Sequence, residues 1–131
     1  MQANGRFDVS RDAQPDCDLG DGAVAAHLRI DKRFHGALDA RSIVHMLAIG
    51  TAVPGSAGYV AVERVSGTLE GRRGAFLLQH SGTMDRGTPS LAVSVVPDSG
   101  SDALAGLRGR MTIDIVDGVH QYAFEYTLPE A

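Results

Sequence analysis

The sequence contains a single cysteine, no tryptophan and no long hydrophobic run. Because Cys17 has no partner, the chain can form neither an internal disulfide nor a cysteine metal cluster. No apolar run approaches the ~20 residues that a membrane-spanning helix needs. The Met1 end also lacks the apolar segment of an export signal. We therefore expect a cytoplasmic protein with no membrane partner.

Aromatic and basic residues are scarce where a nucleic-acid site would need them. Aromatic residues make up 5% of the chain, and they are not interleaved with the 12 lysines and arginines. The formal net charge is -4, and the basic residues form no stripe along the sequence. Because binding to a phosphate backbone depends on such a stripe, nucleic acid is not an expected partner.

Length and turn residues favour one domain built from strands. A chain of 131 residues buries roughly two thirds of its unfolded surface in a single core. Sixteen glycines, many of them in turn dipeptides, are typical of a many-stranded sheet. Residues 10–22 hold four Asp, two Gly, Pro15 and Cys17, a composition that predicts a flexible surface loop. We predict one domain spanning residues 1–131, with this loop near its start.

The most informative pattern is a pair of alternating runs within residues 59–83, one on each side of Glu70-Gly71-Arg72-Arg73. A two-residue hairpin turn needs a residue that tolerates positive φ, which a glycine in the turn supplies. If Gly71-Arg72 is that turn, Glu63 lies directly opposite His80. The face that carries these two groups is otherwise apolar and includes Tyr59, Phe76 and Leu78.

A second hairpin is predicted at the end of the chain. Asp117-Gly118 is a strong signal for a type I′ turn, and it places Ile113 opposite Tyr122. Tyr122 and Tyr126 then share the apolar face of this hairpin.

The run over residues 40–52 leaves one orientation open. If the loop that follows it has an even number of residues, Met46 joins the Glu63 face and His45 points outward. An odd loop reverses both assignments.

About eight strands of this kind, with no amphipathic helix to cover them, must bury their apolar faces against one another. They can do so by stacking two sheets or by closing into a barrel. Long consecutive hairpins favour up-and-down order, so we predict an all-β protein consisting of a single antiparallel β-barrel.

Several segments resemble a known bacterial family. The run from Glu63 to Leu69 reads ERVSGTL, the run from Gln79 to Thr83 reads QHSGT, and Val95-Val96-Pro97 follows. Together with residues 104–109 and 122–128, they resemble the family called domain of unknown function 3224. Members of that family are similar to the allene oxide cyclase type of β-barrel, a likeness that implies an antiparallel barrel and a homo-oligomer.

The candidate site is the pair formed by Glu63 and His80 in the barrel interior. We expect it to bind a small, largely apolar molecule, with the pair as polar anchors. The predicted lining is Met46, Tyr59, Phe76, Leu78, Tyr122 and Tyr126. One alternative is an isomerase or cyclase-like enzyme in which Glu63 controls proton transfer by His80 as catalytic residues. Another is a ligand-free, self-associating module with Val60, Val62 and Leu77 on its contact face. In that case Glu63 and His80 only satisfy one another.

Neither a metal nor a cofactor is expected. No two histidines have the short spacing of a ligand pair, so a metal would need His45 or His120 to converge on His80 and Glu63. The glycines at positions 67, 71 and 74 belong to a hairpin and open no helix, which excludes a glycine-rich phosphate loop.

Overall fold

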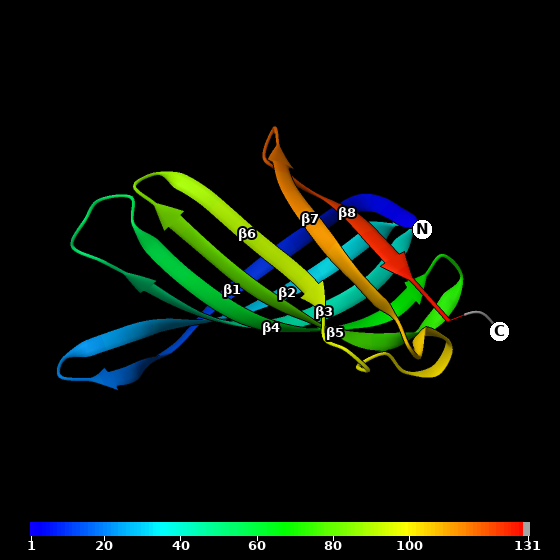
Figure 1. The fold of residues 1–131 in the computed structure, drawn as a ribbon, viewed down its shortest axis with the longest axis horizontal. Coiled ribbons are helices and arrows are strands. Elements are labelled where there is room, and N and C mark those ends of the chain that lie inside the picture. Colours follow the sequence, from blue (N-terminus) through cyan, green and yellow to red (C-terminus); the bar gives the residue numbers. More distant parts are fainter. Residues whose placement is uncertain (130–131) are drawn as a thin grey trace.

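The structure is a computed structural model that describes residues 1–129, and it is a closed barrel of eight antiparallel strands. The strands pair in chain order, and the last pairs with the first (Figure 1). This confirms the predicted all-β barrel. The strands are β1 (Gln2–Gly20), β2 (Ala23–Gly36), β3 (Leu38–Gly50), β4 (Ala57–Leu69), β5 (Arg72–Asp85), β6 (Thr88–Val95), β7 (Arg108–Val116) and β8 (Val119–Thr127), with a single 3-10 turn, η1 (Asp102–Leu104).

The alternation of buried and exposed side chains along the strands explains why the sheet closes into a barrel. In β3 every second residue from Leu38 to Val44 is buried, while the residues between them are exposed. A strand with one apolar and one wet face must turn the apolar face inward, and closure lets all eight strands do so at once. No helix of the described residues is long and apolar enough to cross a membrane.

The final hairpin has the predicted register. Asp117 and Gly118 both have positive φ, at 51° and 78°, as a type I′ turn requires. Ile113 pairs with Tyr122, as the turn signal predicted. This hairpin meets the rest of the barrel weakly on one side, because β6 and β7 join through a single residue pair, Ser94 with Arg110.

The central hairpin turns one residue earlier than predicted. Glu70 and Gly71 form the turn, with φ values of 47° and 83°. Glu63 therefore pairs with Leu78, not with His80. The predicted direct pairing is wrong, because the sequence pattern placed the glycine first in the turn, whereas it occupies the second position. A register shift of two residues preserves the face of every side chain, so Glu63 and His80 still point into the barrel.

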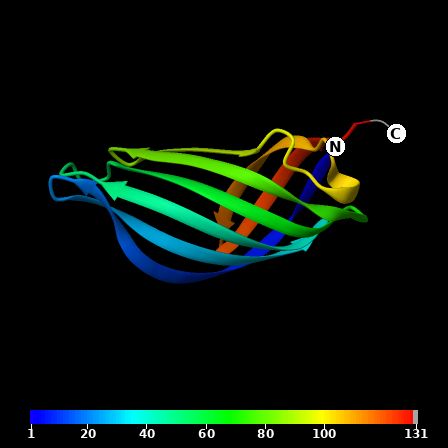
Figure 2. The same cartoon turned by 90° about the horizontal axis from the view of Figure 1, so that it is seen from below.

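Residues 10–22 are not a loop. They continue β1 to Gly20, and β2 begins at Ala23 after a turn at Asp21-Gly22. The predicted loop is wrong because this hairpin projects from the barrel (Figure 1) at the end opposite the N-terminus (Figure 2). Most residues on both of its faces are exposed, and such a strand needs little apolar content. Pro15 lies within the register shift between Gln14 and Cys17, a position where a strand tolerates proline.

The open question about His45 is answered by the pairing of β3 with β4. Met46 pairs with Ala61 and points inward, whereas His45 is exposed on the outer face. This is the arrangement that an even loop predicts.

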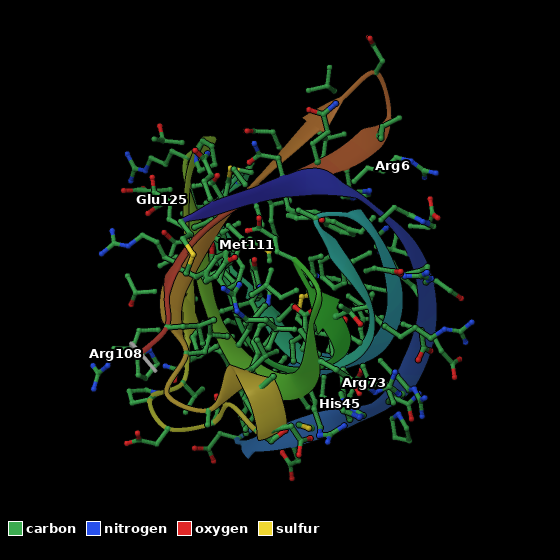
Figure 3. All side chains as sticks on the ribbon, turned by 90° about the vertical axis from the view of Figure 1, so that its right-hand side faces the viewer. Arg6, His45, Arg73, Arg108, Met111 and Glu125 are labelled. Atoms are coloured by element: carbon green, nitrogen blue, oxygen red, sulfur yellow. The ribbon has the colours of Figure 1, made fainter. Side chains whose placement is uncertain are left out.

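One end of the barrel is filled by a packed core. The rings of Phe76 and Phe124 stack 5.7 Å apart, and those of Phe124 and Tyr126 stack 5.3 Å apart. Leu104 of η1 and Leu107 cover this end and are fully buried. Figure 3 views the molecule from this end, and side chains crowd the space inside the ribbon. We call this region the closed end.

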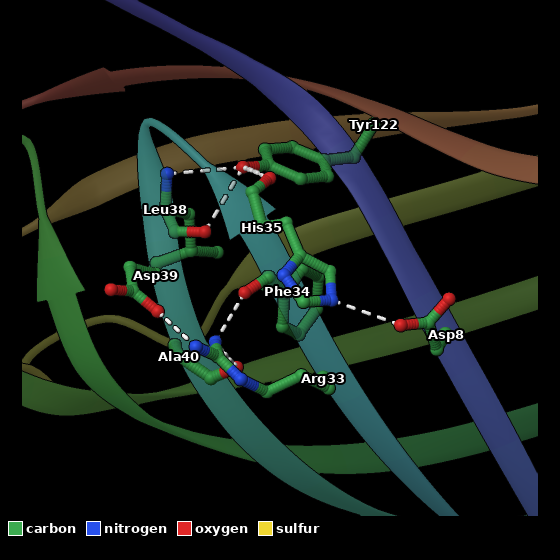
Figure 4. Close-up of polar contacts among 8 residues, drawn as sticks. All are labelled: Asp8, Arg33, Phe34, His35, Leu38, Asp39, Ala40 and Tyr122. Atoms are coloured by element: carbon green, nitrogen blue, oxygen red, sulfur yellow. Dashed lines mark hydrogen bonds and ion pairs between the residues drawn. The ribbon is translucent and has the colours of Figure 1, made fainter.

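Tyr122 ties the closed end to the turn between β2 and β3 (Figure 4). Its hydroxyl donates to the carbonyl of His35 at 2.8 Å and accepts from the N–H of Leu38 at 3.0 Å. The ring lies over Gly5, where a Cβ atom would come within 2.5 Å of the tyrosine oxygen. Gly5 is therefore required by packing, because only a residue without a side chain leaves room for this ring.

Candidate functional site

A cavity of about 390 Å³ lies inside the barrel beyond the closed end. Three of the predicted site residues, Met46, Tyr59 and His80, are on its wall. The rest of the wall is mostly apolar. It comprises Phe7, Val9, Leu28, Ile30, Val44, Ala61, Leu91 and Ile113, together with Arg11, Lys32 and His120.

The other four predicted lining residues do not reach this cavity. Phe76, Leu78, Tyr122 and Tyr126 belong to the packed core of the closed end. Tyr126 is 2% exposed, and its hydroxyl donates to the carboxylate of Glu70. Burial and this carboxylate raise the pKa of Tyr126 to about 12. These four side chains therefore lie below the cavity, in the packed core, and do not face it.

Glu63 is the centre of a buried polar cluster beneath the cavity. Its Oε1 accepts a hydrogen bond from Nε2 of His80 at 2.7 Å and one from Nζ of Lys32 at 3.2 Å. Its Oε2 accepts from the hydroxyl of Ser42 at 2.6 Å. These residues come from β2, β3, β4 and β5, so the cluster joins four adjacent strands. We call Lys32, Ser42, Glu63 and His80 the floor cluster.

The carboxylate of Glu63 is ionised despite being fully buried. Burial raises its pKa, but the His80 hydrogen bond, the Lys32 charge and the Ser42 hydroxyl together outweigh that effect. The net result is a pKa below the ordinary value for glutamate. With an anion at this position, Nε2 of His80 must carry the proton that it donates.

The second ring nitrogen of His80 takes no part in the hydrogen bonds of the floor cluster. Nδ1 has no hydrogen-bond partner within residues 1–129, yet no fully buried side-chain nitrogen or oxygen there lacks one. Nδ1 is therefore not fully buried, and His80 lies on the cavity wall. A neutral His80 presents a lone pair at this position, while a protonated His80 presents an N–H.

Lys32 is the site residue that the sequence reasoning missed. Its side chain is 7% exposed, and Nζ lies 4.6 Å from the centre of the Phe7 ring, a cation–π distance. The signal was present, because Lys32 falls between Ile30 and Phe34 on the apolar parity of β2. A lysine on a buried face needs an acid, and Glu63 is that acid.

Gly82 leaves the space in which the ring of Tyr59 packs on the cavity wall. It pairs with Gly82, and a Cβ atom at Gly82 would come within 2.3 Å of the tyrosine ring. The ring therefore lies flat across this position. Burial, and then the charge of Glu63, raise the pKa of the Tyr59 hydroxyl, so it is a neutral hydrogen-bonding group near the cavity.

The remaining histidines do not join this cluster. His27 and His45 contact each other on the outer surface, with Nε2 and Nδ1 2.9 Å apart. His120 lies on the cavity wall with its ring 5.0 Å from Phe7. In the part of the chain that the structure describes, no group of three or more His, Cys, Asp or Glu side chains could hold a metal ion.

The outer face of β3 and β4 carries exposed apolar side chains. Val60 and Val62 are 55% and 56% exposed, and Leu47 and Ile49 lie beside them on β3. The expectation that this face forms a contact between subunits stays a prediction.

Fold and site together define a small closed β-barrel with a cavity above a buried ionic cluster. The chain belongs to the family described as "Protein of unknown function (DUF3224)", whose sequence profile matches residues 3–126. A crystal structure of a protein of unknown function from this family in Shewanella oneidensis is similar, with 43% sequence identity and a TM-score of 0.92. The match covers 99% of this chain and 98% of that one. No curated protein matches the chain.

Proposed function

We propose that the barrel interior binds a small, largely apolar molecule. The observation that supports this most is a cavity that lies above the floor cluster, whose carboxylate oxygens both have hydrogen-bond partners. A barrel of eight strands can fill its interior with side chains, and the closed end does so. The cavity end of the same barrel instead carries Met46, Tyr59 and Leu28 around open space.

The cavity has the composition of a ligand site. Its volume of about 390 Å³ is near the lower end of the range for small-molecule pockets, roughly 300 to 1,000 Å³. Apolar walls with few polar groups are also typical of such pockets, since apolar contact gives affinity and the polar groups fix orientation. Of the polar groups on the cavity wall, His80 and Lys32 are those that bond the carboxylate of Glu63.

Three of the four methionines provide an internal test of this proposal. Met46 is on the cavity wall, Met111 is buried in the closed end, and Met84 is 41% exposed. With 13C-labelled methionine methyl groups, titration with hexanol is expected to shift the Met46 resonance and leave those of Met111 and Met84 in place. Met46 changes because it contacts the bound chain, whereas Met111 and Met84 do not line the cavity.

Two variants of neighbouring residues in β4 provide the control. Ala61→Phe places a ring in the cavity and is expected to abolish the Met46 response. Val62→Phe places the same ring on the outer face, where Val62 is 56% exposed, and is expected to preserve it. A Met46 resonance that does not respond to hexanol in the folded wild-type protein would refute the proposal.

A further inference from the structure

Within residues 1–129, the cavity wall carries basic side chains and no acidic ones. Arg11, Lys32, His80 and His120 lie on its wall, and no Asp or Glu of the described residues does. The acid beneath them, Glu63, already accepts three hydrogen bonds. The excess of basic side chains on the wall contrasts with the whole chain, whose formal net charge is -4. The cavity wall itself is thus richer in basic than in acidic side chains, unlike the chain as a whole.

We propose that the ligand is a small monocarboxylate with an apolar tail, bound with its carboxylate on Lys32 and His80. This inference rests on the proposed function and specifies its ligand. The carboxylate is expected at the floor cluster, and the tail among the apolar side chains between that cluster and the open end.

The floor has donors to spare, and both oxygens of its carboxylate already have partners. An ammonium group carries three N–H donors, and Lys32 is shown using one of them, to Glu63. Nδ1 of His80 can donate as well once the ring is protonated. A carboxylate accepts two or more such bonds, whereas a ligand ammonium group would face Lys32 as a like charge.

The apolar wall accounts for the tail. Ile30, Val44 and Ala61 form a buried apolar cluster against which Leu28, Met46 and Tyr59 pack. All six also line the cavity. A ligand made only of charged or polar groups would leave these side chains against water or unpaired polar atoms.

Burial distinguishes the floor cluster from Arg11 as the binding partner of the ligand's carboxylate. Arg11 is exposed, so its attraction to a carboxylate is screened by solvent. Lys32 is buried, where the same attraction is stronger. With His80 protonated, Lys32 and His80 together against Glu63 leave the floor cluster with one net positive charge, which a monoanion balances and a phosphate dianion would exceed.

Three six-carbon compounds with different head groups test the inference. Hexanoate, hexanol and hexylammonium share one tail, and their dissociation constants can be measured by the shift of the Met46 methyl resonance. We expect hexanoate to bind about tenfold more tightly than hexanol, and hexylammonium to bind most weakly. Equal affinity for hexanoate and hexanol would overturn the anion assignment while the cavity proposal stands. No Met46 response to any of the three would instead refute the proposed function itself.

Two variants locate the carboxylate. The double variant Lys32→Met with Glu63→Gln removes both charges of the floor pair and is expected to reduce the preference for hexanoate to within about twofold. Arg11→Gln, at an exposed wall position, is expected to keep the preference. The opposite result, with the preference lost only in Arg11→Gln, would overturn binding at the floor.

A third test uses only the wild-type protein, so its result does not depend on whether a variant folds. Nuclear Overhauser contacts are expected between the hexanoate methylene next to the carboxylate and the His80 ring. The terminal methyl group of hexanoate is expected to contact Met46 or Tyr59 instead. The reverse orientation would overturn the proposal.

Discussion

Replacing Glu63 with leucine is expected to lower the free energy of unfolding by about 3 to 5 kcal/mol. Leucine has a similar volume but accepts no hydrogen bond. Lys32 then becomes a buried cation without its acid, and the donors on His80 and Ser42 lose the oxygens that they now reach at 2.7 Å and 2.6 Å. The cost arises mainly from these stranded groups, because an ion pair itself contributes little net stability.

Urea denaturation of a double-mutant cycle measures this effect. The combined variant Lys32→Met with Glu63→Leu removes both charges and is expected to recover more than half of the loss. Glu125→Leu, at an exposed position of β8, serves as the control and is expected to change stability by less than about 0.5 kcal/mol. A Glu63→Leu protein as stable as the wild type would contradict the role of the floor cluster.

Gly5→Ala is expected to destabilise the barrel by about 3 kcal/mol. The new Cβ atom would lie 2.0 Å from the carbonyl oxygen of His35 and 2.5 Å from the hydroxyl oxygen of Tyr122. The first is backbone, and the second is fixed by its bonds to residues at the turn between β2 and β3. Neither neighbour can move without breaking the junction that closes β1 onto β2 and β8.

Gly50→Ala is the matched control for this prediction. Gly50 ends β3, and a Cβ atom there would have no neighbour within 4 Å. We expect no loss of stability, since alanine also restricts the unfolded chain more than glycine does. Thermal unfolding followed by circular dichroism compares the two variants. Equal unfolding temperatures would show that the junction around Gly5 can relax.

The barrel could be predicted because alternation and turn signals are local properties of the sequence. Asp117-Gly118 specified its hairpin completely, since both turn positions tolerate positive φ. At Glu70-Gly71-Arg72-Arg73 the glycine could occupy either turn position, and the register was misplaced by two residues. The faces were still right, because a shift of two preserves which side each residue points to.

The candidate site could be predicted only in part. Glu63 and His80 stood out as polar residues on an apolar face, but the contact between them depends on a diagonal neighbour, which periodicity does not single out. Lys32 comes from β2, and its pairing with Glu63 is a contact across barrel strands that no local pattern reveals. The division of the interior into a packed end and a cavity depends on how side chains fill space, so Phe76, Leu78, Tyr122 and Tyr126 were assigned to the wrong region.

The most direct test of a ligand-binding barrel is native mass spectrometry of the wild-type protein, purified without denaturation from the cells that naturally produce it. We predict an added mass that disappears on denaturation and is absent from Ala61→Phe, whose new ring occupies the cavity. The same added mass should remain in Val62→Phe. A wild-type protein that carries no added mass, or an adduct that Ala61→Phe retains, would contradict the account.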